Sequence, residues 1–137
     1  MDSINHKYVT KGAIEGLVMK IGLPTPDEFS QDWEYVVSDS SRISEFLSAY
    51  KTVELNAEEK FALMIIIISS YDDAITIKRV EGNWRNTIRK FLLEDISIHH
   101  NTFFYWAMLE EEDLENCFYV TPLMREIITD AQLEEQD

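Results

Sequence analysis

The chain has 137 residues and a mass of 16.1 kDa, which is the size of one domain. It carries 26 acidic and 12 basic side chains, and its formal charge of −14 argues against a protein that binds nucleic acid or an anionic membrane, because both would repel it. Hydrophobic residues make up 45% of the chain, which is enough for a folded core. The single cysteine, Cys117, excludes an intrachain disulfide and favours a reducing compartment.

We expect neither a secretory signal nor a membrane-spanning segment in this sequence. The first seven residues lack the apolar stretch of a signal peptide. The longest apolar run, Phe61 to Ile68, is eight residues long, whereas a spanning helix needs about 20. We therefore expect a cytoplasmic protein that folds as one domain over residues 1–137, with residues 1–10 and 132–137 as loose ends.

Apolar residues at helical spacing predict three short helices in the first fifty residues. Gly22 and Pro24 end the first helix, Pro26 suits the opening of the second, and Ser40 or Ser41 suits the N-cap of the third. The apolar stripes that define these helices are Ile14, Leu17, Val18 and Ile21, then Phe29, Trp33, Val36 and Val37, then Ile43, Phe46, Leu47 and Tyr50.

The strongest helix start is at Asn56, because Asn56 and Glu59 have the spacing of a capping box. The segment that follows is apolar on most faces, which predicts a buried central helix ending near Asp73. Its four consecutive isoleucines would also suit a buried strand, but the capping box and the polar residues at its end favour a helix. Residues 74–80 alternate weakly and are compatible with an extended segment.

Three further amphipathic stripes follow. Thr121 and Pro122 predict an N-cap and a first-turn proline for the last helix, and residues 117–120 are expected to form a short extended connector. Together the patterns predict an all-α fold, a single compact globule of about six to seven short amphipathic helices around one buried helix. The stripes are Trp84, Ile88, Phe91 and Leu92, then Ile98, Thr102, Tyr105 and Leu109, then Met124, Ile127, Ile128 and Ala131.

Few residues have a pattern that indicates catalysis. Asp95 and His99 have an i, i+4 spacing that could hold a metal, but His100 points about 100° away on a helix and no clear third ligand is near. Cys117 has apolar neighbours and no flanking base, so a small core residue is the better interpretation. No phosphate-binding, zinc-protease or Cys-x-x-Cys motif occurs. We therefore expect no enzyme activity, no cofactor and no metal.

Four consecutive aromatic residues, from Phe103 to Trp106, point in almost every direction around a helix. Either the helix is fully buried, which is the preferred interpretation, or at least one ring is exposed as a binding anchor. The same two interpretations apply to Trp33 and Tyr35.

The charge is unevenly distributed. Residues 101–137 contain ten acids and one base, Arg125, and thus hold −9 of the −14. A second acidic stretch lies between residues 27 and 39. Five of the twelve bases lie in the middle of the chain: Lys78, Arg79, Arg85, Arg89 and Lys90. Such runs are often only solvated faces, but concentrated self-repulsion destabilises a fold, which favours a function for the imbalance.

Short segments at capping and core positions share the pattern of one group of proteins: residues 30–35 (SQDWEY), 55–64 (LNAEEKFALM) leading to 70–73 (SYDD), Ile98-His99, Tyr105-Trp106, and 121–125 (TPLMR). Over about residues 12–130, the chain resembles the small helical immunity proteins that accompany bacterial polymorphic toxins, including contact-dependent growth inhibition systems. The resemblance implies a cytoplasmic antitoxin that binds one cognate toxin domain and blocks its active site. Contact residues vary among immunity proteins, so it assigns no role to a particular residue.

The hypothesis from sequence is therefore an immunity protein that covers the active site of a basic toxin domain, most simply a nuclease, with an acidic surface. One alternative is a nucleic-acid mimic that inhibits DNA-binding proteins. Another is a small metal-dependent hydrolase that uses Asp95, His99 and His100. The predicted partner-binding acids form three patches: Glu110, Glu111, Glu112, Asp113 and Glu115; Asp72 and Asp73; Asp32 and Glu34.

Overall fold

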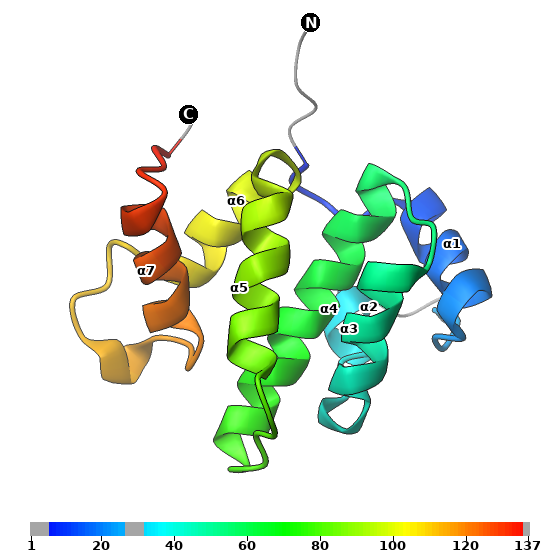
Figure 1. The fold of residues 1–137 in the computed structure, drawn as a ribbon, viewed down its shortest axis with the longest axis horizontal. Coiled ribbons are helices and arrows are strands. Elements are labelled where there is room, and N and C mark those ends of the chain that lie inside the picture. Colours follow the sequence, from blue (N-terminus) through cyan, green and yellow to red (C-terminus); the bar gives the residue numbers. More distant parts are fainter. Residues whose placement is uncertain (1–5, 27–31, 136–137) are drawn as a thin grey trace, which may run out of the picture.

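A computed structural model describes residues 6–26 and 32–135 (Figure 1). No strand occurs within these ranges, and the all-α prediction is confirmed. The elements are α1 (Lys11–Ile21), α2 (Trp33–Val36), the 3₁₀ turn η1 (Ser40–Arg42), α3 (Ile43–Thr52), α4 (Ala57–Thr76), α5 (Trp84–Glu94), α6 (Ile96–Ala107), the 3₁₀ turn η2 (Leu114–Asn116) and α7 (Thr121–Asp130).

The fold is organised around α4. Every residue from Phe61 to Ile68 is buried, because α4 packs against α1, α2, α3, α5 and α6. Figure 1 shows α4 in the middle of the molecule, with α1 at one end and α7 at the other. The prediction of a buried central helix is confirmed. Within the described ranges, no helix combines the length and the apolar character needed to cross a membrane.

The predicted capping box at the start of α4 is present. The Asn56 side chain accepts a hydrogen bond from the Glu59 amide at 2.8 Å, and Glu59 Oε1 accepts one from the Asn56 amide at 2.9 Å. The Glu59 side chain is almost completely buried, and Lys20 Nζ of α1 lies 2.7 Å from Glu59 Oε1. This ion pair compensates the buried carboxylate and joins α1 to the first turn of α4.

Two predictions for the N-terminal half are wrong. The N-cap at Ser40 or Ser41 is replaced by Asp39, whose Oδ1 accepts a hydrogen bond from the Ser41 amide at 2.9 Å. The two serines therefore lie within η1, and α3 begins at Ile43. The second helix is a single turn, α2, which does not begin at Pro26. Phe29, which was assigned to its stripe, lies outside the described residues.

Three boundaries in the second half also differ from prediction. Residues 74–76 are not extended, because α4 continues to Thr76, and the buried Ala74 packs in the core. Residues 117–120 form a bend and a turn after η2 rather than an extended connector. Thr121 does not cap α7: its hydroxyl, buried in the first turn, donates to the Trp106 carbonyl at 2.7 Å.

The buried face of α6 is rotated relative to the predicted stripe. Tyr105 is exposed, and Leu109 lies beyond the end of the helix and is also exposed. α6 contacts α4, α5 and α7, and this placement, which periodicity could not define, decides which face is covered. The buried residues of α6 are His99, Thr102, Phe103, Trp106 and Ala107.

Residues near both ends of the described chain contact the core. The His6 ring stacks on Phe61 with 5.6 Å between centroids, and the His6 carbonyl accepts a hydrogen bond from Asn101 Nδ2 at 2.9 Å. Leu133, beyond α7, is partly buried against the core.

We predict that Gly16→Ala destabilises the fold by about 1–3 kcal/mol, since it displaces a buried capping residue. A Cβ at Gly16 would lie 1.8 Å from Glu59 Oε2, and Glu59 is held by both Asn56 and Lys20. Gly12→Ala is the matched control, because no atom lies within 4 Å of its Cβ position. This control should be neutral or stabilising. Urea unfolding measures both variants, and equal stability changes would contradict the prediction.

Candidate protein-binding surface

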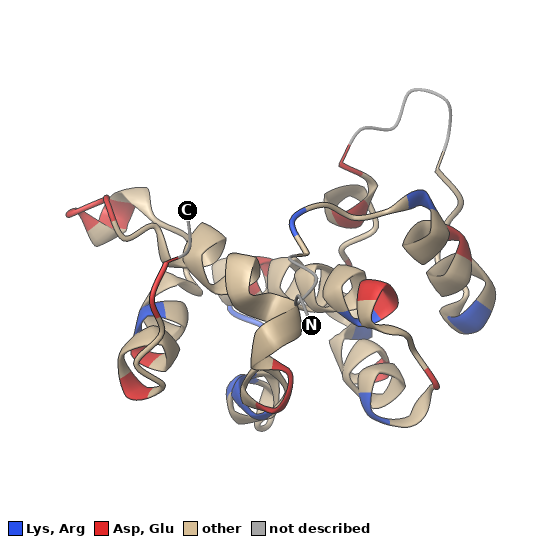
Figure 2. Ribbon diagram, turned by 90° about the horizontal axis from the view of Figure 1, so that it is seen from above, with Lys and Arg blue, Asp and Glu red and all other residues tan. Residues whose placement is uncertain are grey.

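The loop between α6 and α7, residues 108–119, is here called the acidic loop. It contains the five acids of the first predicted patch and no basic residue. Figure 2 shows it at the edge of the molecule opposite α1. Met108 ends α6 in a left-handed conformation, and Asp113 Oδ1 caps η2 by accepting a hydrogen bond from the Glu115 amide at 2.9 Å.

Arg125 of α7 holds the acidic loop by its backbone. Its Nε donates to the Ala107 carbonyl at 2.7 Å, and its Nη2 donates to the carbonyls of Met108 and Glu111. The first of these carbonyls belongs to the end of α6, where backbone acceptors lack helical partners and a cation complements the helix dipole. The one base that the sequence places in this acidic segment thus fixes the shape of the loop.

Asp72, assigned to the second patch, has a structural role within the chain. Its Oδ1 accepts a hydrogen bond from the Val120 amide at 3.0 Å, which ties α4 to the start of α7. Burial raises the pKa of Asp72 above its ordinary value, although hydrogen bonds from the Val120 and Tyr119 amides oppose the shift. Asp73 beside it is exposed, and partial burial raises its pKa as well.

The five acids of the acidic loop divide into two groups. Glu111 Oε1 accepts a hydrogen bond from the Asp113 amide at 3.1 Å, so Glu111 and Asp113 shape the loop itself. The side chains of the other three, Glu110, Glu112 and Glu115, are exposed and form no ion pair with a base in the described ranges. These three carboxylates are exposed and take no part in holding the loop.

Large apolar side chains are exposed beside these acids. Leu109, Leu114 and Tyr119 of the acidic loop are each at least half exposed, as is Tyr105 at the end of α6. The ring of Tyr105 stacks on Phe118 with 6.0 Å between centroids. Apolar and aromatic residues within a charged rim are typical of protein interfaces.

The two interpretations of the aromatic run are resolved residue by residue. Phe103 and Trp106 are buried, Phe104 is partly buried, and Tyr105 is exposed. Trp33 is a core residue, because it is buried and its Nε1 donates to the Pro24 carbonyl at 2.8 Å.

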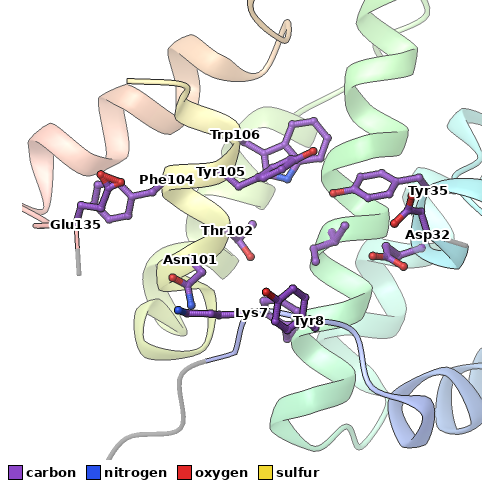
Figure 3. A pocket seen from close by; sticks show the side chains of 13 residues that line it. Lys7, Tyr8, Asp32, Tyr35, Asn101, Thr102, Phe104, Tyr105, Trp106 and Glu135 are labelled. Atoms are coloured by element: carbon purple, nitrogen blue, oxygen red, sulfur yellow. The ribbon is translucent and has the colours of Figure 1, made fainter. Parts of the chain in front are cut away.

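The third patch, Asp32 and Glu34, lines a hollow of about 510 Å³ between α2, α4 and α6 (Figure 3). The hydroxyl ends of Tyr35 and Tyr105 point toward each other in this hollow. Burial and a hydrogen bond to Tyr105 raise the pKa of Tyr35 above its ordinary value. The hollow is also lined by Phe104, which belongs to the aromatic run, and by Thr102 and Glu135, which sequence reasoning did not single out as site residues.

The hollow and the acidic loop are neighbours. Phe104 and Glu135 line the hollow and also line a second depression formed with Leu109, Glu110 and Glu111. The first and third patches, 76 or more residues apart in the chain, therefore lie on adjoining surface.

Part of the basic segment is paired within the molecule. Arg85 Nη2 of α5 lies 2.9 Å from Glu126 Oε2, and Arg89 Nη2 lies 2.9 Å from Asp130 Oδ2, both on α7. Arg89 also lies 3.6 Å from Glu126. Two of the ten C-terminal acids are thus compensated by α5, whereas the five acids of the acidic loop form no ion pair with a described base.

Two of the three residues proposed as metal ligands belong to a buried hydrogen-bonded cluster. The Tyr50 hydroxyl donates to Asp95 Oδ2 at 2.6 Å and lies 2.8 Å from His99 Nε2. Because the single hydroxyl proton points to Asp95, His99 Nε2 carries a proton and donates to Tyr50. His100 packs on Phe104 instead. In the described part of the chain, no group of three or more His, Cys, Asp or Glu residues could hold a metal ion.

Cys117 is half-buried rather than a core residue. Its Sγ lies 3.6 Å from the Asp113 carbonyl and 3.8 Å from Arg125 Nη2, so it fills space beneath the acidic loop.

We predict that Arg125→Ala lowers the free energy of unfolding by about 2–4 kcal/mol, because three backbone carbonyls lose a charged donor. The same variant should speed hydrogen exchange and glutamate-specific proteolysis within residues 108–119. Arg85→Ala, which removes only an exposed ion pair, should cost at most about 1 kcal/mol and leave loop protection unchanged. If loop exchange is the same in both variants, Arg125 does not hold the loop.

A second prediction concerns pH. Burial lowers the pKa of His99 from 6.5 to about 3, against the opposing effect of Asp95. Below pH 6.5 the unfolded chain therefore binds a proton that the folded chain does not, and stability is lost as the pH falls towards 3. His99→Gln keeps an N–H for Tyr50 but does not titrate.

As the pH falls from 6 to 4, the wild type should lose stability relative to the His99→Gln variant. The difference between their unfolding free energies should change by about 1.4 kcal/mol per pH unit. Urea unfolding at several pH values provides the measurement. Carboxylates contribute equally to both proteins, so a pH-independent difference would mean that His99 titrates alike in the folded and unfolded states.

The acidic loop and the hollow adjoin each other, and together they form a candidate binding surface with carboxylates and exposed apolar side chains. No family model matches the chain, and no match was found among curated proteins or solved structures.

Proposed function

We propose that this chain is an immunity protein, an antitoxin that binds a cognate basic toxin domain, a nuclease, and covers its active site. The observation that carries the proposal is the acidic loop. It combines three unpaired carboxylates with the exposed Leu109, Leu114 and Tyr119 on a backbone held by Arg125. On this proposal the protein acts in the bacterial cytoplasm.

Charge is the first physical reason for this assignment. Opposite potentials accelerate encounter between proteins by orders of magnitude and disfavour partners of the wrong sign. A nuclease domain presents positive charge where it binds phosphates. The carboxylates of Glu110, Glu112 and Glu115 would occupy that place and exclude the nucleic acid.

Rigidity is the second reason. A loop that must become ordered on binding loses conformational entropy and therefore affinity. The acidic loop is already held by Arg125, by the Asp113 cap of η2 and by Asp72 at the start of α7. Its exposed apolar side chains can then act as anchors within an acidic rim.

The direct test is co-expression with the toxin domain encoded by the neighbouring upstream reading frame. The wild-type chain should restore growth, inhibit the toxin's nuclease activity and form a purified complex. Absence of both protection and complex formation with that toxin would contradict the proposal.

Charge reversal locates the interface. Glu112→Lys combined with Glu115→Lys should weaken the complex at least tenfold, mainly through slower association. The difference from wild type should shrink as salt rises, because exposed charges are screened. Neither side chain shapes the loop, so the fold should be unaffected.

The matched control is Glu15→Lys combined with Glu81→Lys, which changes the net charge equally at exposed positions on α1 and before α5. It should bind almost as the wild type does. Equal losses in both double variants would mean that overall charge, rather than the acidic loop, governs binding.

A further inference from the structure

The hollow is lined by three carboxylates, those of Asp32, Glu34 and Glu135, and by the rings of Tyr35 and Tyr105 among others. Asp32 precedes α2, Tyr35 lies on α2, and Tyr105 lies on α6. The buried side chains of Phe61 and Ile65 from α4 form the floor. In Figure 3, the residues of α2 approach from one side of the hollow and those of α6 from the other.

A buried hydroxyl in the wall lacks a partner. Thr102 is only 3% exposed, and its Oγ1 forms no hydrogen bond within the described residues. Figure 3 shows this oxygen directed into the space between α6 and α4. An unsatisfied buried hydroxyl destabilises a fold, so a hydrogen-bonding ligand in the hollow would relieve the deficit.

The carboxylates of the hollow also lack a counter-charge. Asp32 does not cap α2, and neither Asp32 nor Glu34 forms an ion pair with a described base. Burial raises the pKa of Glu34, and the charge of Asp32 raises it further. Lys7 lines the same hollow, but Figure 3 shows its amine beside Asn101, directed away from Asp32.

The rings of Tyr35 and Tyr105 also line the hollow. Aromatic faces attract ammonium and guanidinium groups, and the attraction strengthens where water is excluded. A guanidinium group fits better than an ammonium group, because it is planar, stacks on rings, is more weakly hydrated and presents five donors. Two carboxylates and the Thr102 oxygen supply acceptors for these donors.

We propose that the hollow binds a guanidinium group, that of an arginine side chain on the protein partner. Its volume of about 510 Å³ lies within the range of ligand pockets and accommodates such a side chain. The inference rests on the proposed function for the identity of the partner, but the isolated chain suffices to test the site itself. An arginine anchored here would join the hollow and the acidic loop in one interface.

The test is a titration of the isolated, isotope-labelled protein with Nα-acetyl-arginine amide, followed by NMR. Amide signals around Thr102 and Tyr105 should shift saturably with millimolar affinity, as expected for so small a ligand. Nα-acetyl-citrulline amide has almost the same shape without the charge, and it should cause no saturable shift. Equal responses to the two compounds, or no response to either, would overturn the proposal.

Variants assign the groups involved. Asp32→Asn combined with Glu34→Gln should weaken binding about tenfold or more. Glu15→Gln, at an exposed position on α1, should leave it unchanged. Thr102→Val should weaken binding severalfold yet raise the melting temperature, because it removes the unsatisfied hydroxyl. A threonine with a purely structural role would lose stability without an effect on arginine binding, which would exclude Thr102 from the site.

A further arm identifies the source of the guanidinium group. Agmatine carries the same group on a free small molecule, and binding of agmatine without binding of the blocked arginine would overturn the side-chain assignment. Arginine binding without toxin neutralisation would uphold the hollow and reject the proposed function. Toxin neutralisation by a chain that binds no arginine probe would reject only the hollow.

Discussion

The burial of α4 is the constraint on which the structure depends. Its apolar run from Phe61 to Ile68 has no face that could be left in water, so five other helices must surround it. Its first turn contains the buried Glu59, which is compatible with the core because it closes the capping box and pairs with Lys20. The surrounding helices in turn determine where the polar groups can lie, which is at their outer faces and in the connections between them.

The acidic loop is one of the polar connections between the surrounding helices, and Arg125 stabilises its conformation. Five carboxylates in six residues repel one another, and without support they would favour an expanded loop. Arg125 binds the backbone carbonyls beneath them rather than their side chains. The loop is therefore held in shape while the side chains of Glu110, Glu112 and Glu115 remain exposed. The pairing of Arg85 and Arg89 with α7 compensates Glu126 and Asp130, whereas the acids of the loop form no ion pair with a described base.

Sequence patterns correctly predicted the elements that are determined by residues close together in the chain. The Asn56 capping box, the helical stripes and the central helix follow from neighbouring residues and are present. Failures occurred where a distant residue decides the outcome. Thr121 has the sequence of a cap but donates to the Trp106 carbonyl. The exposed face of α6 was misjudged because its mixed apolar and aromatic surface leaves the contacts with α4, α5 and α7 to select the buried side.

By itself, the sequence determined the all-α class, the central helix and the large acidic excess, because periodicity, capping and charge are properties of neighbouring residues and of composition. Only the tertiary structure decided which acids are available, since pairing and burial depend on residues far apart in the chain. In the folded chain, Asp32 and Glu34 lie with Tyr105 around one hollow, and the Thr102 hydroxyl has no partner among the described residues. Arg125 donates hydrogen bonds to the backbone of the acidic loop. Helix packing creates these juxtapositions, and no local pattern encodes them.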